Sequence, residues 1–448
     1  MRKCESFGKY RVVRLGQEEC VTSGRWADCG GRSFINKKHF RISRAVIPGR
    51  HLVGLPSTSS GQGKAQPTFR ASFRRSIKKG GVLSPHFFEK YTMDIILGIE
   101  TSCDETAASV VIDGCEVRSS VVSSQIAKHA LYGGVVPEIA AREHLTAIAY
   151  VVETALKSAD VAIRDVSALA VTNGPGLIPS LLIGVNFAKG LAAGHNIPLV
   201  GINHFIAHIY GCFLENGIEK LARPETFPIL ALVVSGGHTA LVLITADGNA
   251  RIVGTTLDDA AGEAFDKAAK LLHLGYPGGP VIEKTAKNGN PAKFAFPRSL
   301  TGTSGKALYE KDRFNFSFSG VKTSLYYHCI KLGGGENLTG EILYDSVASY
   351  QEAIVDVLVR KTVGAAEHFS ASTIVLCGGV ACNGALRERM KKALPEKRQL
   401  IIAHPKYCTD NAAMIAGLAW HDFRAGHFDG SDLDAYSRMP ELSKVAFV

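Results

Sequence analysis

Two pairs of apolar segments, each pair joined by a short polar turn, stand out in the pattern of hydrophobic and polar positions. Continuous apolar runs at residues 95–99 and 107–112 predict strands that are buried on both faces. The same order of apolar strand, small polar turn and apolar strand recurs at residues 229–234 and 240–244. This repeat predicts two related lobes, each opening with a strand pair.

Between and after these pairs, strands alternate with helices. The apolar segment 165–171 predicts a strand that leads through a glycine turn into an apolar helix at residues 181–193. A short strand at 199–202 precedes a turn with two histidines, and a long amphipathic helix at 346–366 precedes a strand at 373–376. Alternation of this kind is typical of an α/β fold.

Three glycine turns are candidates for nucleotide binding. Ser235, Gly236 and Gly237 follow a buried strand, and their backbone amides can point into one concavity that suits phosphate. An ordinary hairpin turn would have the same sequence pattern. Further glycine turns lie at residues 275–279, after a helix with paired acids, and at 378–379, after a strand. Because the sequence has neither a Walker P-loop nor a GxGxxG motif, the three turns indicate a nucleotide clamped between two lobes.

His204 and His208 are spaced as two ligands of one metal ion. Four residues apart on a helix, both imidazoles lie on one face, although helical histidines are often packing or surface residues. Phe205 stands where metallopeptidases of the HExxH type carry their general base, so this turn supplies no base. Asp410, before an Ala-rich helix, is either a helix cap or a third ligand. Two histidines and a carboxylate with open positions favour a divalent transition metal, iron or zinc.

Two further segments have alternative interpretations. Asp104 and Glu105 lie in the turn between the first two strands, where they either cap the turn and face water or take part in catalysis. Residues 297–323 alternate phenylalanine with serine or asparagine and contain several basic residues. Such a segment either stacks on single-stranded RNA or forms a buried strand followed by a surface loop.

The positive charge of the protein is concentrated at the beginning of the chain. The 448 residues carry a net charge of +10, but residues 1–92 are strongly basic and the remainder is mildly acidic. The overall charge therefore says nothing about nucleic-acid binding by the body of the protein. We expect residues 1–92 to be a disordered extension, either an organellar transit peptide or sequence upstream of a true start at Met93. The first alternative implies a mitochondrial or plastid protein, and the second a bacterial-type cytoplasmic protein.

Membrane and disulfide architectures are not indicated. The first 92 residues contain no apolar run long enough for a secretory signal or a membrane span. The ten cysteines include no C-x-x-C pair and show no regular spacing. We therefore expect free thiols in a reducing compartment, with no zinc ribbon and no disulfide framework.

Eight motifs together resemble those of one known family. In chain order they are GIETSCDET, NHFIAH, VSGGHT, LDDAAGEAFDK, YPGGP, FSFSGVKT, CGGVACN and CTDNAAMIA. Through them, residues 95 to 423 are similar to the TsaD family, also called Gcp, the universal tRNA threonylcarbamoyltransferases. The resemblance implies a two-lobed actin/sugar-kinase/Hsp70-like (ASKHA) fold of the α/β class, with a nucleotide and metal cleft between the lobes. The expected lobes are residues 93–226 plus 413–436, and residues 227–412.

The resemblance also implies an activity and a set of site residues. Members of the family transfer threonylcarbamoyl from threonylcarbamoyl-AMP to the exocyclic amine of the adenosine 3′ of the anticodon, in tRNAs that read codons starting with A. One divalent metal per subunit, iron in preference to zinc, is expected on His204, His208 and Asp410. The expected contacts of the adenylate are Val233, Val234, Ser235, Gly236, Gly237, Asp266, Gly279, Glu283 and Asn383. Glu283 departs from the family, which often has aspartate at that place.

The chemistry of this reaction suggests further roles. An exocyclic adenine amine is a poor nucleophile, so we expect a metal to polarise the acyl carbon and a carboxylate to accept the proton. Asp104 is the first candidate for the proton acceptor and Glu105 the second. The expected partners are tRNA, threonylcarbamoyl-AMP, a paralogous dimerisation subunit and an ATPase subunit of a bacterial-type complex. An organellar member could instead act as a self-sufficient homodimer.

Three other functions are alternatives to the transferase. A metal-dependent glycoprotein endopeptidase would need a general base near the two histidines, and the sequence places none there. A small-molecule kinase of the same fold would leave the two histidines and Asp410 unexplained. A catalytically silent scaffold would not need the complete set of motif residues.

Overall fold

The structure of the chain is a computed structural model that describes residues 12–14, 93–215, 217–302, 309–438, 442 and 444–447. Most of the expected extension, residues 1–92, lies outside this set. Its one described element is β1 (Val12–Arg14), which runs parallel to β4 (Glu116–Ser124). Within the described part of the chain, no helix combines the length and the hydropathy that a membrane crossing requires.

The first sheet has six strands in the order β1-β4-β3-β2-β5-β6. β2 (Ile95–Glu100), β3 (Glu105–Ile112) and β4 form an antiparallel meander. β5 (Ala168–Gly174) and β6 (Leu199–Asn203) run parallel to β2. The apolar runs near the start of the body thus form buried strands, as predicted.

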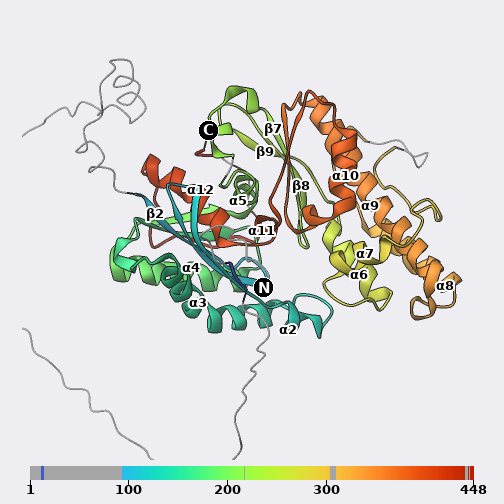
Figure 1. Ribbon diagram of the computed structural model, residues 1–448, viewed down its shortest axis with the longest axis horizontal. Helices are drawn as coiled ribbons and strands as arrows, with labels where there is room; N and C mark the ends of the chain where they lie inside the picture. Colours follow the sequence, from blue (N-terminus) through green and yellow to red (C-terminus); the bar gives the residue numbers. More distant parts are fainter. Residues whose placement is uncertain are drawn as a thin grey trace, which may run out of the picture. The chain divides into compact units, whose positions relative to one another are not determined.

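The second sheet has five strands in the order β11-β10-β7-β8-β9. β7 (Ile229–Val234), β8 (Thr239–Ile244) and β9 (Ala250–Thr255) form a second antiparallel meander. β10 (Thr373–Cys377) and β11 (Gln399–Ile402) run parallel to β7 (Figure 1). Strand order and directions repeat those of β4-β3-β2-β5-β6, which confirms the expected two-lobed actin/sugar-kinase/Hsp70-like fold of the α/β class.

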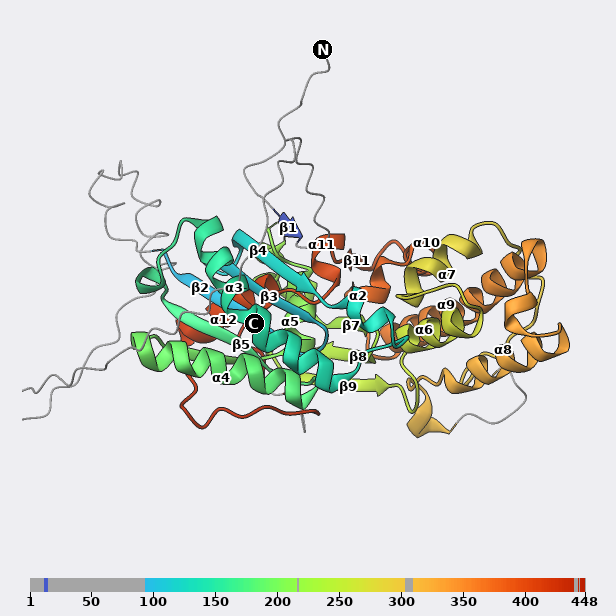
Figure 2. The same ribbon diagram turned by 90° about the horizontal axis from the view of Figure 1, so that it is seen from below.

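Helices cover both faces of the first sheet. The short α2 (Ile126–Ala130) precedes α3 (Pro137–Ala159), which packs on β3 and β4, and α4 (Ile178–His195) packs on β5. α3 and α4 lie side by side across one face (Figure 2). α12 (Ala412–Ala425), from near the end of the chain, packs on β2 and β3 through the other set of buried strand residues. The first sheet is therefore completed by a helix that follows the second.

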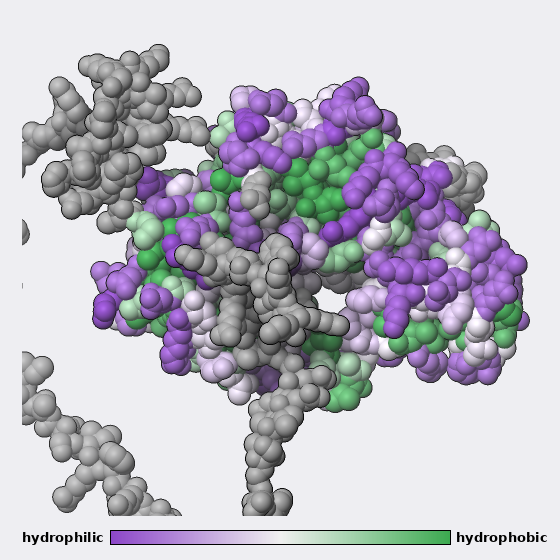
Figure 3. All heavy atoms as spheres, in the orientation of Figure 1, coloured by the Kyte–Doolittle hydropathy of each residue, from purple (hydrophilic) through white to green (hydrophobic). Residues whose placement is uncertain are grey.

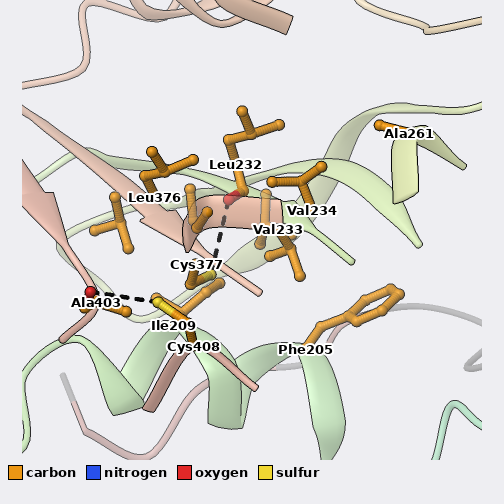
Figure 4. Close-up of a cluster of buried hydrophobic side chains, with 14 of the residues drawn as sticks. Phe205, Ile209, Leu232, Val233, Val234, Ala261, Leu376, Cys377, Ala403 and Cys408 are labelled. Atoms are coloured by element: carbon orange, nitrogen blue, oxygen red, sulfur yellow. Dashed lines mark hydrogen bonds between the residues drawn. The ribbon is translucent and has the colours of Figure 1, made fainter. Parts of the chain in front are cut away.

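α5 (His204–Gly211) lies at the junction of the two sheets. It packs against β6 and α12 of the first lobe and against β7 and β10 of the second. One hydrophobic core consequently runs from the first sheet through α5 to the second sheet. Figure 4 shows Phe205 and Ile209 of α5 directed toward the residues of β7 and β10. The histidines of the NHFIAH motif are thereby held where the lobes meet.

The helices of the second lobe pack largely on one another. They are α6 (Ala261–Leu271), α7 (Gly278–Ala286), α8 (Ser319–Lys331), α9 (Gly340–His368) and α10 (Gly384–Ala393). A 3₁₀ turn, η7 (Gly379–Cys382), joins β10 to α10, and α11 (Pro405–Cys408) lies between β11 and α12. In Figure 3 hydrophobic residues gather in the upper middle of the face, where Figure 1 places β7 and β8, and hydrophilic residues border them.

The aromatic residues of the FSFSGVKT motif belong to the core of this lobe. Phe316 and Phe318 are buried, and the Asp258 carboxylate accepts hydrogen bonds from the flanking serine hydroxyls at 2.6 and 2.7 Å. Asp258 thereby fixes the start of α8 against the LDDAAGEAFDK motif. The alternative that this segment stacks on RNA is wrong for these two rings, because RNA bases cannot reach them. Residues 303–308 of the segment lie outside the described part of the chain.

Candidate metal and nucleotide site

His204 and His208 face the same side of α5 because the helix begins directly at His204. The Asn203 side chain caps the helix by accepting hydrogen bonds from the backbone N–H groups of Phe205 and Ile206, at 2.9 and 3.1 Å. With the helix started there, the two histidines are one turn apart and their Nε2 atoms are separated by 3.2 Å. Both side chains are buried.

Asp410 completes a cluster with these histidines. Its Oδ1 lies 3.1 Å from Nε2 of His208 and 3.5 Å from Nε2 of His204. α12 is capped by Asn411, whose side chain accepts a hydrogen bond from the N–H of Met414 at 3.1 Å. Asp410 is therefore not the cap of this helix, and its carboxylate points to the imidazoles instead.

The geometry of the three side chains fits one metal ion. One ligand atom from each of His204, His208 and Asp410 lies within 4.8 Å of the others. Ligand atoms that sit about 2.0–2.2 Å from a tetrahedral ion are roughly 3.3–3.6 Å apart, and smaller angles bring them closer. The separations of 3.1, 3.2 and 3.5 Å agree with this spacing. Two imidazoles and one carboxylate are also donors that a divalent transition metal accepts.

Glu100 is a functional candidate that the sequence reasoning did not identify. It is the last residue of β2 and fully buried, and its Oε2 lies 3.1 Å from Nδ1 of His204. The same carboxylate accepts hydrogen bonds from the Thr172 hydroxyl and the Ser102 N–H, each at 2.5 Å. A proton held on Nδ1 leaves the Nε2 lone pair of His204 free toward Asp410. The available signal was an acid at the end of an otherwise apolar strand.

The electrostatics of the cluster favour positive charge. Burial alone would lower the pKa of His204, but the carboxylates of Glu100 and Asp410 raise it to about 9. Burial and the neighbouring His204 lower the pKa of His208. For Asp410, burial acts to raise the pKa, but the two imidazoles outweigh it and hold the pKa well below its usual range. A cation between these groups is therefore stabilised by two carboxylates.

Asp104 lies in the loop after β2 and Glu105 begins β3, and the surrounding structure fixes both residues. His144, which is buried on α3, donates from Nε2 to the Cys103 carbonyl at 2.9 Å, and the Gln125 N–H donates to the Asp104 carbonyl at 3.0 Å. Burial, then the charges of Asp104 and Asp410, raise the pKa of Glu105 well above its usual range. A raised carboxyl pKa in a partly buried loop differs from what a turn facing water would show, and such shifts are frequent at functional sites.

The first glycine turn packs against the start of α6. The N–H of Gly262 donates to the Ser235 carbonyl at 3.2 Å, and a Cβ added at Gly262 would come within 2.7 Å of the Gly236 Cα. Among the described residues, no heavy atom lies within 4 Å of a Cβ added at Gly236 or Gly237. The turn thus combines open glycines with the N-terminus of a helix, which is an arrangement that suits an anion.

The other two glycine turns approach the same place. Gly378, with φ of +90°, lies directly against the Val234 carbonyl, where a Cβ has no room. The N–H of Gly278 donates to the Asp266 carboxylate at 2.6 Å, which joins the second turn to α6. Burial, together with the charges of Asp104 and Glu263, raises the pKa of Asp266 to about 6 against the effect of the Gly278 hydrogen bond.

The remaining predicted contacts of an adenylate link α7 to α10. Glu283 on α7 accepts a hydrogen bond from the N–H of Gly384 at 3.1 Å. The Asn383 side chain donates to Gln351 at 2.9 Å and accepts from the N–H of Leu386 at 3.0 Å, so it caps α10. Gly279 follows the second glycine turn as the second residue of α7. Val233 and Val234 are the last two residues of β7, the strand before the first glycine turn. The amide of Asn383 is thus bonded within the protein.

Comparisons with known proteins agree with the motif resemblance. The model of the TsaD family, tRNA N6-adenosine threonylcarbamoyltransferase, matches residues 116–417. A protein of that name from Syntrophotalea carbinolica is 49% identical over 345 residues, which cover 77% of this chain and 95% of the relative. Another from Syntrophus aciditrophicus is 49% identical, covering 77% and 97%, and one from Thermomicrobium roseum is 45% identical, covering 78% and 98%.

These matches bear on the alternatives as well. The relatives carry the name of a transferase, so the endopeptidase and small-molecule kinase alternatives are not favoured. The residues matched by the family model include the whole second sheet, β4, β5 and β6 of the first sheet, and the segment that carries Asp410. The chain belongs to the tRNA N6-adenosine threonylcarbamoyltransferase family.

Proposed function

We propose that the chain transfers the threonylcarbamoyl group from threonylcarbamoyl-AMP to N6 of the adenosine 3′ of the anticodon, in tRNAs that read codons starting with A. The observation that carries the proposal is the cluster of His204, His208 and Asp410 at the junction of two lobes that also bring three glycine turns together. The names of the relatives supply the acyl group and its acceptor.

His204, His208 and Asp410 would hold the metal in this proposal. Two histidines and one carboxylate with open positions are typical of non-haem iron sites, which favours iron over zinc. A bound divalent ion would act as a Lewis acid toward the carbonyl oxygen of the acyl group. Glu100 would orient His204 through Nδ1, as carboxylates commonly do for metal-binding histidines.

The second lobe would bind the adenylate. The amides of Ser235, Gly236 and Gly237, together with the N-terminus of α6, offer donors to its phosphate. Asp266, when ionised, can accept hydrogen bonds from ribose hydroxyls, as acidic residues do in other nucleotide sites. Glu283 and Asn383 would shape the wall formed by α7 and α10.

Asp104 is proposed as the proton acceptor. The adenine amine would attack the carbonyl carbon, AMP would leave, and the amine proton would pass to the Asp104 carboxylate. Glu105 has a pKa raised well above its usual range by burial and by the neighbouring carboxylates, which makes it a weaker candidate for the proton acceptor when Asp104 is charged. Cys103 and His144 would hold the loop in place through their 2.9 Å hydrogen bond.

A paralogous partner subunit is proposed to dock on α3 and α4. Exposed positions of α4 include Pro179, Leu182, Asn186 and Gly190, all uncharged, and Leu145 of the neighbouring α3 is 68% exposed. A helix whose exposed positions combine an apolar residue with small or uncharged residues is typical of an interface. By family resemblance, the proposed bacterial-type complex also contains an ATPase subunit.

The test is transfer to tRNA by the purified chain with its partner subunits and threonylcarbamoyl-AMP. Mass spectrometry of the nucleosides should detect threonylcarbamoyladenosine. His208→Ala should lose both the metal and at least 100-fold of the transfer rate, whereas His328→Ala, a change on α8 away from the cluster, should keep them. Absence of the modified nucleoside with all partners present, or metal-dependent cleavage of a glycoprotein instead, would refute the proposal.

A further inference from the structure

Two cysteines link the glycine turn at η7 to the segment that carries Asp410. Cys382 ends η7 and is exposed, whereas Cys408 ends α11 and is buried. The two thiols interact, because each shifts the pKa of the other. The Cys408 thiol also donates to the Ala403 carbonyl at 3.4 Å (Figure 4). The proposed mechanism uses neither thiol.

Arg387 binds both sides of this contact. Its Nη2 donates to the Cys408 sulfur at 3.4 Å and to the Ala403 carbonyl at 3.2 Å. Its Nε donates to the Ala381 carbonyl, the residue before Cys382, at 2.5 Å. The guanidinium therefore holds η7 and α11 together and places a fixed positive charge beside the two sulfurs.

Cys382 has the surroundings of a reactive cysteine. The neighbouring Cys408 thiol and the charge of Arg387 lower the pKa of Cys382 to about 7, against the effects of partial burial and of Glu283. A larger fraction of this thiol is then thiolate at neutral pH than of an ordinary cysteine. A neighbouring second thiol and access to solvent are the other properties of redox-sensitive cysteines.

We propose that Cys382 and Cys408 are a peroxide-sensitive dithiol that closes to a disulfide between the nucleotide turn and the metal loop. The Cys382 thiolate attacks hydrogen peroxide, the O–O bond breaks, and a sulfenic acid and hydroxide form. The Cys408 sulfur then displaces the sulfenic hydroxyl, and its proton leaves with that hydroxyl as water. In sum, two thiols and one peroxide give one disulfide and two waters.

Other thiols of the described residues are less suited to this reaction. Cys377 is fully buried, and its thiol donates to the Leu232 carbonyl at 3.8 Å (Figure 4). Burial raises its pKa well above the usual range, which keeps it in the unreactive protonated form. Cys329 is also buried, on α8, and burial raises its pKa. Among the described cysteines whose pKa is shifted, Cys382 is the one with a lowered pKa, so peroxide should react first there.

The disulfide would act on the proposed site from both sides. Cys382 directly precedes Asn383, the cap of α10, and Cys408 lies two residues before Asp410. A covalent bond between the two sulfurs would draw η7 and α11 together and displace one of these residues. Because displacements of about 1 Å at a reacting centre can cost roughly 100-fold in rate, we expect the oxidised protein to lose at least tenfold. This functional part rests on the proposed transferase activity.

The experiment uses the full chain with its partners. The reduced protein is assayed for transfer, treated with hydrogen peroxide, alkylated and digested without reductant. Mass spectrometry should find the Cys382 and Cys408 peptides joined, and the lost transfer rate should return with dithiothreitol. Cys382→Ser should form no such linkage and keep its rate at the same peroxide dose. Cys329→Ser is the matched control and should behave as the unmodified protein.

Other outcomes would contradict either the formation of the disulfide or its effect on transfer. Conversion of Cys382 to sulfinic acid without the joined peptides, or linkage of Cys382 to another cysteine, overturns the dithiol. A complete disulfide with an unchanged transfer rate overturns its effect on the site. If the reduced protein shows no transfer at all, the proposed function has failed, and the peptide linkage still decides whether the dithiol exists.

Discussion

Glu100→Gln should weaken metal binding while leaving the fold intact. The substitution keeps the shape of a fully buried side chain and replaces one carboxylate oxygen with an NH₂ group. If the remaining oxygen keeps the Ser102 N–H, the new NH₂ group faces Thr172 and Nδ1 of His204. Nδ1 must then accept a hydrogen bond, so the imidazole proton moves to Nε2, the atom that faces Asp410.

The magnitude follows from this change of tautomer. Metal binding would have to displace the proton from Nε2 and leave an unfavourable contact at Nδ1. Loss of a carboxylate partner behind a metal-binding histidine costs about 10- to 100-fold in affinity, or about 1.4–2.7 kcal/mol. The effect falls on one ligand only, because Nδ1 of His208 has no hydrogen-bond partner among the residues that the structure describes.

The assay is equilibrium dialysis against buffers of fixed free zinc or iron(II), with bound metal measured by mass spectrometry. Asp345→Asn provides a matched control, because Asp345 is another buried carboxylate and accepts a hydrogen bond from the Asn290 N–H at 2.6 Å. Both variants should unfold at somewhat lower temperature, and only Glu100→Gln should lose metal affinity. Equal affinity within twofold in Glu100→Gln, or an equal loss in Asp345→Asn, would refute the reasoning.

Two more predictions concern the nucleotide and the partner. Because the pKa of Asp266 is raised to about 6, its ionised form predominates above that pH and is lost as pH falls, so an adenosine nucleotide should bind about tenfold more weakly at pH 5 than at pH 7. Calorimetry should show that Asp266→Asn binds the nucleotide weakly at both pH 5 and pH 7. If this variant keeps the pH dependence of the unmodified protein, another group is responsible for it. Leu182→Glu should weaken association with the paralogous subunit at least tenfold in the same measurement, with an unchanged melting temperature. Ile330→Glu, a change at another exposed apolar position, on α8, should have no effect, and full affinity in Leu182→Glu would exclude α4 from the interface.

The sequence predicted the sheets better than the contacts between distant segments. Apolar runs identified the paired strands because buried strands leave a continuous signal. The spacing of His204 and His208 likewise fixed their common face. The sequence did not identify Glu100, because one acid at the end of an apolar strand gives no sign of its side-chain partners. These partners, Thr172 and His204, lie over 70 residues away along the chain. The sequence left two interpretations of Phe316 and Phe318. Their burial depends on a segment that Asp258 holds in place, and the sequence alone does not show that contact.

The strand directions explain why these separate residues meet. β2, β5 and β6 are parallel, so their carboxyl ends share one edge of the first sheet, and Glu100, Thr172 and His204 lie at or directly after those ends. β7, β10 and β11 are parallel in the second sheet, and the chain after them carries Ser235, Gly378 and, beyond α11, Asp410.

Ligands of open α/β sheets bind beyond the carboxyl ends of the strands. Here one such edge supplies the histidines with their buried carboxylate, and the other supplies the glycine turns and the third ligand. α5 lies where both sheets contact it, so the cluster forms only when the two lobes are packed together. Neither sheet supplies all of the metal ligands and glycine turns. A change that loosens the packing of α5 between the lobes should therefore disturb the metal contacts and the nucleotide contacts together.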